Sequence, residues 1–228
     1  MSKTQSVVSL DPIERNRKKQ DSPIGRLFKT RHRGGKSVKK SEPFGHYLFC
    51  GPQGSSKTTS AIWYMEKLKK LYERKGFKVR IFSNMGFGIP ITKITLPDIL
   101  EKIEYKKDVV NIIIVDEIHS WYPKDTKDKT TLLLIDRLTG CFSQLRKRQA
   151  FVLSTAQVYG RLNKNLREQC LYMVACKVSV FNRCVNDFIA SEDILCDDLG
   201  RWSGVAKFIY THGLPKTKFD THKLISSI

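Results

Sequence analysis

The feature that most constrains this chain is the segment Gly51-Pro-Gln-Gly-Ser-Ser-Lys-Thr58, which lies between two regular patterns. Before it, the apolar residues 46–50 predict a short strand. After it, residues 58–75 carry apolar side chains three residues apart with lysines and glutamates between them, which predicts an amphipathic helix. A glycine-containing turn that joins a strand to a helix directs its backbone NH groups toward one point. The segment is therefore expected to bind an anion such as phosphate.

The residue types of this loop suit a nucleotide. Lys57 can reach the β- and γ-phosphates, and the hydroxyl of Thr58 can bind magnesium. Ser56 stands where the pattern GxxxxGK[ST] has its second glycine, and if that position has a positive φ, serine carries a strain of about 1 kcal/mol. The alternative is a turn whose lysine is merely exposed. The predicted nucleotide-binding residues are Gly51, Pro52, Gln53, Gly54, Ser55, Ser56, Lys57, Thr58 and Thr59.

A pair of acidic residues follows the strongest apolar run of the chain. Residues 109–116 predict a strand whose continuous valine and isoleucine side chains suit a central parallel strand covered on both faces. Its carboxyl end delivers Asp116 and Glu117 to the same edge of the sheet as the loop. We expect Asp116 to hold magnesium and Glu117 to act as the general base that polarises the attacking water. Acids at a strand end are often only solvated, but the loop about sixty residues upstream favours a shared site.

Polar residues also flank the fourth predicted strand, residues 150–155. Gln157, just past its carboxyl end, is expected to face the crevice and contact the γ-phosphate or the attacking water, with a plain surface glutamine as the alternative. Arg146 and Arg148 precede the strand, at the opposite edge of the sheet from the nucleotide of their own subunit. Either can reach the ATP of a neighbouring subunit and stabilise charge in the transition state, and the sequence does not choose between them.

Strands and helices alternate along residues 44–195, which predicts one α/β ATPase domain with a mainly parallel central sheet flanked by helices. Residues 196–228 predict a C-terminal appendage with a small hairpin. At 228 residues the chain is long enough for one substantial core and a tail. The remaining elements expected are strands at residues 78–83 and 171–180 and helices at residues 96–105 and 132–145.

Residues 1–43 differ from the rest because they hold few large apolar side chains and several basic clusters. Such a segment cannot bury enough surface to offset the entropy lost on ordering, so we expect a flexible basic N-terminal arm. The whole chain has a net charge of +19, which favours a polyanionic partner, most commonly nucleic acid. A solvated basic surface is the alternative.

Composition argues against several classes of protein. The longest apolar runs are of strand length and the first thirty residues are polar and basic, so the sequence predicts neither a membrane span nor a signal peptide. We therefore expect no membrane partner and a cytoplasmic location. None of the six cysteines forms a CxxC pair or stands at zinc-finger spacing. They are expected to be buried in a reducing compartment, with no metal site built from cysteine or histidine.

Taken together, GPQGSSKT, IIIVDE, the arginines before the fourth strand and STAQ at its end resemble the FtsK/HerA-like branch of P-loop ATPases, over residues 44–180. Within that branch the chain is most similar to small viral ATPases that package or export a genome. The zonula-occludens-toxin-like assembly proteins of filamentous phages share the order of Ser83-Asn84, the acidic pair and Gln157. The packaging ATPases of small tailed phages similarly place arginines before a short fourth strand.

The resemblance implies a RecA-like (ASCE) P-loop NTPase fold, the cofactors ATP and Mg²⁺, and a homo-oligomeric ring around DNA with ATP at the subunit interfaces. Hydrolysis would then drive translocation of DNA, expected to be double-stranded, during packaging of a viral genome, with a portal or capsid protein as a further partner. Filamentous-phage members carry a membrane segment, which is not predicted here, and this favours a packaging motor. Two alternatives stay open: a helicase or replication-type ATPase, and a nucleic-acid-binding assembly protein with weak or no ATP hydrolysis.

Overall fold

The structure is a computed structural model of the chain, and it describes residues 31–33, 36–38, 43–86, 88–89, 91–95, 98, 103–121, 127–196 and 202–219. Most of the predicted N-terminal arm lies outside these residues, and so does most of the helix predicted at 96–105. Within the arm, the backbone forms an antiparallel hairpin of β1 (Arg31–Arg33) and β2 (Lys36–Val38). Residues 103–105, the expected end of the helix, are not helical.

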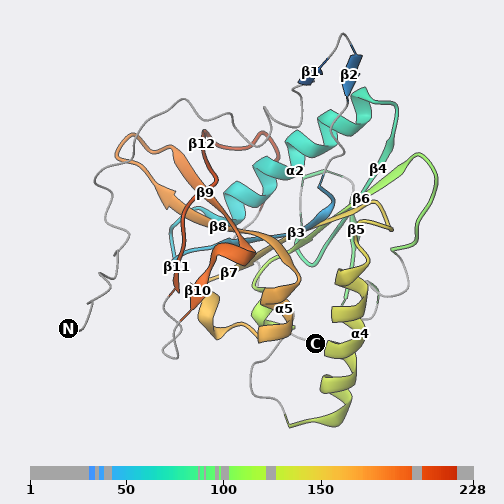
Figure 1. The fold of residues 1–228 in the computed structure, drawn as a ribbon, viewed down its shortest axis with the longest axis vertical. Coiled ribbons are helices and arrows are strands. Elements are labelled where there is room, and N and C mark those ends of the chain that lie inside the picture. Colours follow the sequence, from blue (N-terminus) through green and yellow to red (C-terminus); the bar gives the residue numbers. More distant parts are fainter. Residues whose placement is uncertain are drawn as a thin grey trace.

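An eight-stranded sheet forms the centre of the molecule (Figure 1). Its strands are β3 (Gly45–Cys50), β4 (Lys78–Ser83), β5 (Thr92–Lys93), β6 (Val109–Val115), β7 (Ala150–Ala156), β8 (Cys170–Val178), β9 (Cys184–Ala190) and β12 (Phe208–His212). They lie in the order β12-β9-β8-β3-β7-β6-β4-β5. All neighbours from β8 to β5 are parallel, whereas β9 pairs antiparallel with both β8 and β12. The predicted α/β fold with a mainly parallel sheet is confirmed.

Helices cover both faces of this sheet (Figure 1). The helix α2 (Lys57–Arg74) lies on one face, and α4 (Lys129–Ser143) and α5 (Lys164–Glu168) lie on the other. Three short 3-10 helices complete the described elements: η1 (Ile118–Ser120), η2 (Tyr159–Arg161) and η3 (Ser191–Asp193). The predicted helices at 58–75 and 132–145 correspond to α2 and α4 to within three residues at each end.

The alternation of side chains along β3 divides the core into two layers. Tyr47 and Phe49 pack toward α2, whereas Leu48 and Cys50 pack toward α4 and α5. The central strand β6 contributes to both layers, and its residues 112–115 are completely buried, as the continuous apolar run predicted.

The parallel strands bring three polar segments to one edge of the sheet. Cys50 at the end of β3 is opposite Ala156 of β7, and Val115 at the end of β6 is opposite Ser154. The loop after β3, the acidic pair after β6 and Gln157 after β7 therefore leave the sheet at the same edge.

The C-terminal part of the chain differs in detail from the prediction. A hairpin is present, but it pairs β10 (Leu195–Cys196) with β11 (Trp202–Ser203) and so begins before the residues from which it was expected. The apolar run that follows, however, supplies β12, which extends the central sheet through β9. The sequence pattern did not predict β9, because the buried polar residues Asn186 and Asp187 interrupt its apolar run.

Among the helices described, none combines the length and the apolar composition that crossing a bilayer requires.

Candidate nucleotide-binding site

The backbone of the predicted phosphate loop follows a course that demands glycine at two positions. A Cβ atom at Gly51 would lie 2.8 Å from the carbonyl oxygen of Cys176 in β8, so the loop passes too close to the neighbouring strand for a side chain. Gly54 has a φ of 77°, in the left-handed region. The turn between β3 and α2 is thus shaped as an anion-binding loop requires.

Ser56 does have a positive φ, the condition under which serine is strained at this position. Its φ and ψ are 66° and 23°, directly before the first residue of α2. A serine in this left-handed conformation carries a strain of about 1 kcal/mol. The hydroxyls of Ser55 and Ser56 are buried and have no hydrogen-bond partner among the described residues. The loop therefore holds two polar groups that a bound phosphate can satisfy.

The side chain of Lys57 bonds back to the loop that precedes it. Its side chain is buried, and Nζ donates a hydrogen bond to the carbonyl oxygen of Pro52 at 2.9 Å. A buried ammonium group requires an acceptor of this kind. A phosphate oxygen is a stronger acceptor because it carries charge, so the ammonium group has a better partner available once a nucleotide binds.

Thr58 and the acidic pair meet, as the sequence predicted. Oδ1 of Asp116 accepts hydrogen bonds from the hydroxyl of Thr58 at 2.9 Å and from that of Thr155 at 2.6 Å. Asn84, just past β4, donates from Nδ2 to the Asp116 carbonyl oxygen at 3.0 Å and accepts at Oδ1 from the Asp116 NH at 2.9 Å. Asn84 therefore fixes the backbone of Asp116, and Thr58 and Thr155 fix its carboxylate.

Glu117 stands in a constrained conformation beside Asp116. Its φ is 54°, and its backbone NH donates to the Thr155 hydroxyl at 2.9 Å. Oε2 lies 3.1 Å from Nδ1 of His119, and the Glu117 side chain is 26 % exposed. A carboxylate that is positioned in this way, and still reached by solvent, can accept a proton from a water molecule in the crevice.

The oxygen atoms at this point fit a magnesium ion. The Thr58 hydroxyl and the Asp116 carboxylate are 2.9 Å apart, and both are hard oxygen donors of the kind that Mg²⁺ prefers. The hydrogen bond between them orients both oxygens toward one place. The residues present therefore fit the predicted metal, which Thr58 and Asp116 would hold.

An open cavity of about 760 Å³ adjoins the loop, and we call it the loop cavity. It is lined by residues 50–55, by Gln157 after β7, by the end of β8 and by Trp202 of β11. Gln157 is exposed, so its amide shares the cavity with the loop. Burial raises the pKa of the Cys50 and Cys176 thiols well above the ordinary value, so both line the cavity as neutral groups.

The two candidate arginines lie in the turn between α4 and β7, at the opposite edge of the sheet from the loop. Arg148 is half-buried, and its Nη1 donates to the Ile103 carbonyl oxygen at 3.0 Å, so its guanidinium group serves a contact within the subunit. Arg146 is exposed. Of the two, Arg146 is thus the better placed to contact a second subunit.

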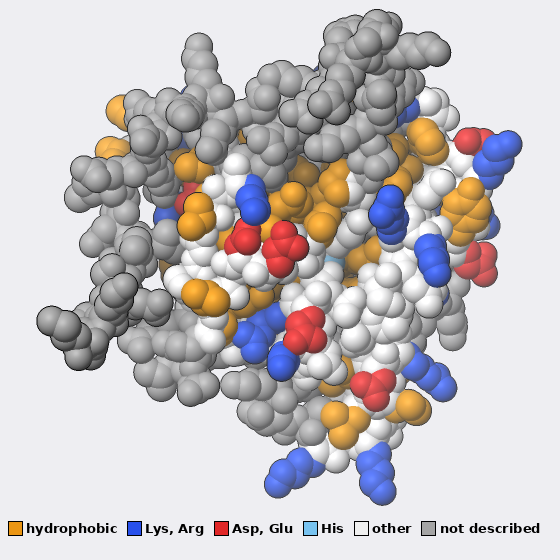
Figure 2. Space-filling model, in the orientation of Figure 1, with side chains coloured by type: hydrophobic (Ala, Val, Ile, Leu, Met, Phe, Trp, Pro, Cys, Tyr) orange, Lys and Arg blue, Asp and Glu red, His pale blue; other side chains and the backbone are white. Residues whose placement is uncertain are grey.

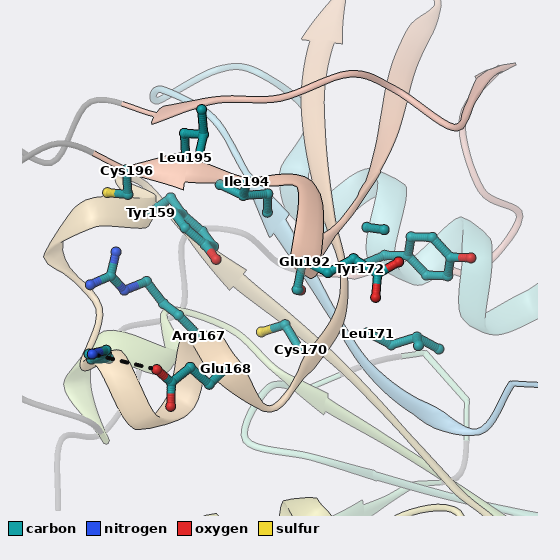
Figure 3. A pocket seen from close by; sticks show the side chains of 13 residues that line it. Tyr159, Arg167, Glu168, Cys170, Leu171, Tyr172, Glu192, Ile194, Leu195 and Cys196 are labelled. Atoms are coloured by element: carbon teal, nitrogen blue, oxygen red, sulfur yellow. Dashed lines mark ion pairs between the residues drawn. The ribbon is translucent and has the colours of Figure 1, made fainter.

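A second cavity, of about 710 Å³, lies between α5 and β10, and we call it the α5 cavity (Figure 3). The guanidinium group of Arg167 lies over the ring of Tyr159 there, 5.5 Å from its centre. Lys164 and Glu168 of α5 form an ion pair at 3.8 Å. None of the described residues that line this cavity belongs to the phosphate loop or the acidic pair, so it is separate from the nucleotide site.

Three contacts of the site were not assigned from the sequence: those of Asn84, Thr155 and His119. Asn84 and Thr155 stand at the carboxyl ends of β4 and β7. Because such ends meet at one edge of a parallel sheet, a polar residue at each of them was the available signal. His119 follows the acidic pair by two residues, and only the 3-10 turn of η1 brings it back to Glu117.

The fold and the site together define a P-loop NTPase in which an additional strand, β7, lies between the strand of the loop and the strand of the acidic pair. Residues 47–176 match the family described as "ATPase family associated with various cellular activities (AAA)". This match spans more than half of the 228 residues, so the chain belongs to the AAA family of ATPases. No curated protein sequence matches the chain.

Two solved structures are similar to this chain to different degrees. The N-terminal domain of zonular occludens toxin from Neisseria meningitidis is similar with a TM-score of 0.54 and 18 % identity, covering 75 % of this chain and 95 % of that one. The genome packaging NTPase B204 from Sulfolobus turreted icosahedral virus 2, in complex with ATP-gammaS, gives a TM-score of 0.39 and 14 % identity, over 61 % of this chain and 77 % of that one. The likeness to the toxin domain confirms, at the level of the fold, the resemblance seen in the sequence motifs.

Proposed function

We propose that this protein is an ATP-driven DNA translocase that packages a viral genome into a capsid. The observation that carries the proposal is the 2.9 Å contact between Thr58 and Asp116, which unites the phosphate loop and the acidic pair in one crevice. Hydrolysis of ATP requires both halves together, because one binds the phosphates and the other activates water.

Each residue of the site has a role in this reaction. Lys57 leaves the Pro52 carbonyl oxygen and binds the β- and γ-phosphates of ATP, together with the NH groups of the loop. Glu117 accepts a proton from water as the water oxygen bonds to the γ-phosphorus and the bond to ADP breaks. Gln157 orients that water or the γ-phosphate. A magnesium ion held by Thr58 and Asp116 supplies positive charge that neutralises the phosphate oxygens.

The basic charge of the chain supports a nucleic-acid substrate. Residues 1–43 carry 12 lysines and arginines against four acidic residues. On the described surface, Figure 2 shows lysine and arginine side chains spread over the viewed face rather than gathered in one patch. Contacts with the phosphate backbone suit a motor that moves along any sequence. We assign the basic arm to DNA or to a portal or capsid protein, in the host cytoplasm.

The position of the arginines supports a homo-oligomeric ring. Arg146 is exposed at the edge of the sheet opposite the loop, where it does not reach the nucleotide of its own subunit. In a ring it extends to the ATP of the neighbour and stabilises the charge of the transition state. The Arg146→Ala variant is expected to keep ATP binding and lose most hydrolysis, with Arg137→Ala on the exposed side of α4 as its control.

The decisive experiment measures phosphate release with and without double-stranded DNA, in the wild type and in Glu117→Gln. We expect DNA to stimulate the wild type, and the variant to hydrolyse ATP about 100-fold more slowly while still binding it, since a general base contributes at least this much. Equal rates in the two proteins would contradict the proposal. Strand separation in the same mixture would instead favour a helicase, and closed rings on DNA in electron micrographs would favour the motor.

One observation favours a second candidate function, an assembly protein that binds nucleic acid and hydrolyses ATP weakly. Ser56 strains the loop at the position where the usual pattern has glycine. A loop that is less well pre-organised binds and turns over ATP less efficiently. If the wild type binds DNA but releases phosphate no faster than Glu117→Gln, while Ser56→Gly does so, this second function is the correct one.

A further inference from the structure

We infer that the loop cavity is the base-binding half of the nucleotide site, and that Trp202 stacks on the nucleobase of the bound triphosphate. This inference rests on the proposed function, because it requires a nucleotide at the phosphate loop. It assigns a role in ligand specificity to the β10–β11 hairpin, which the sequence presented only as an appendage.

The first support is continuity between the cavity and the loop. Residues 50–55 line the cavity directly, so a ligand whose phosphates lie on the loop has its remaining part beside or inside this space. The volume of about 760 Å³ falls within the range of small-molecule sites, about 300–1,000 Å³. The cavity opens toward β8, on the side of β3 away from the strand of the acidic pair, β6. The γ-phosphate faces Glu117, so the base points the other way.

The second support is the character of the side chains around the cavity. Val158, which follows β7, and Val178, the last residue of β8, border it and are 39 % and 45 % exposed. Trp202 of β11 adds an aromatic ring to the lining of the cavity. Exposed apolar groups around a concave site indicate that something flat and apolar covers them, and a nucleobase has this character.

The third support is the way in which Trp202 is held. It packs against the core layer on the α4 and α5 side of the sheet while remaining partly exposed. The next residue but one is Gly204, where a Cβ atom would lie 2.8 Å from Cγ2 of Ile189, so β11 approaches β9 closely. The ring is therefore fixed before a ligand arrives, which lowers the entropy lost on stacking.

The test compares two ligands, ATP and inorganic tripolyphosphate, by titration calorimetry with Mg²⁺ on the full chain. Tripolyphosphate has the phosphates but no base. We expect the wild type to bind ATP more tightly than tripolyphosphate. Trp202→Ala should weaken ATP binding about tenfold, as expected for the loss of one stacked ring, and leave tripolyphosphate unchanged. Trp202→Phe should retain most of the affinity for ATP.

Two further variants distinguish the loss of a contact with the base from a general effect of a substitution on folding. Val178→Ser changes an exposed position and should weaken ATP alone by about fourfold, because it removes apolar contact with the base equivalent to about one CH2 group. Trp63→Ala removes a tryptophan that stacks on His212, away from the cavity, and should change neither affinity.

Each result decides between the claims. If the wild type binds neither ligand, the proposed function fails and the inference with it. If the wild type binds both ligands but Trp202→Ala binds ATP normally, or loses both ligands equally, only the inference is overturned. Selective loss of ATP in Trp202→Ala and Val178→Ser supports it.

Discussion

The two halves of the nucleotide site are built in opposite ways. In the acidic half, Asp116 receives hydrogen bonds from Thr58, Thr155 and Asn84, and the backbone of Glu117 is bonded to Thr155. In the loop half, the hydroxyls of Ser55 and Ser56 are buried without a partner among the described residues, and Lys57 bonds to its own loop. Asp116 is therefore held in place before a ligand arrives, although Oε2 of Glu117 is buried without a hydrogen-bond partner among the described residues, whereas the polar side chains of the loop are left without fixed partners outside it.

This difference separates two requirements of the reaction. The Asp116 carboxylate and the backbone of Glu117 must be placed accurately, and their hydrogen bonds fix these positions in the ligand-free state. The loop must gain free energy on binding, and unsatisfied polar groups together with a strained residue provide that gain when phosphate oxygens replace weaker partners. We therefore expect changes in the loop to act on affinity, and changes around Asp116 to act on stability and on the rate of hydrolysis.

The largest effect is expected from Lys57→Ala. Removal of the ammonium group deletes the charged donor that binds the phosphates, so the affinity for ATP should fall by about 100-fold, measured by calorimetry. Lys70→Ala, an exposed lysine on the same helix, is the control and should bind ATP normally. Unchanged binding in Lys57→Ala would mean that the nucleotide does not lie on this loop.

An intermediate effect is expected from Thr155→Val in the acidic half. The variant keeps the shape of the side chain but leaves the Glu117 NH without its acceptor and removes one donor to Asp116. The free energy of unfolding should fall by about 2 kcal/mol, a decrease in Tm of roughly 4–8 °C for a chain of this size.

In the same variant ATP hydrolysis should slow, while the affinity for ATP changes little. The matched control is Thr139→Val on α4, whose hydroxyl donates to the Ile135 carbonyl oxygen within the same helix. A Thr155→Val protein that loses affinity for ATP as strongly as Lys57→Ala would erase the distinction between the two halves.

The smallest effect is expected from Ser56→Gly. Glycine adopts the left-handed conformation without strain, so the protein should be stabilised by about 1 kcal/mol, with a rise in Tm of about 2–4 °C and a modest gain in affinity for ATP. The control is Asp108→Gly, since Asp108 also has a positive φ, of 61°, but lies in the turn before β6. It should give a similar rise in Tm with no change in affinity.

The sequence predicted the parts of the fold that depend on local pattern. The apolar run of β6, the helical spacing of α2 and the glycines of the loop each predicted the observed structure within a few residues. The convergence of loop and acidic pair was predictable because parallel strands end at a common edge.

The parts that were not predicted depend on contacts between distant segments. The pairing of Arg148 with the Ile103 carbonyl oxygen joins residues 45 positions apart, and nothing in the local pattern distinguishes it from Arg146. The strand β9 was missed because its buried Asn186 is satisfied by Ser60 and His212, which lie far away in the sequence. A buried strand that contains polar residues paired in this way lacks the continuous or alternating apolar pattern from which a strand is predicted.

The pairing of β10 with β11 allows a fluorescent label to be placed opposite Trp202. Cys196 stands directly opposite Trp202 on these two strands, and it is exposed whereas the other five cysteines are buried. Because thiol reagents attack accessible thiols first, a maleimide dye will label Cys196 selectively, without removal of the remaining cysteines. The fluorescence of the dye would then report, in real time, changes in the surroundings of the Trp202 indole ring across the hairpin as each nucleotide binds and its products are released.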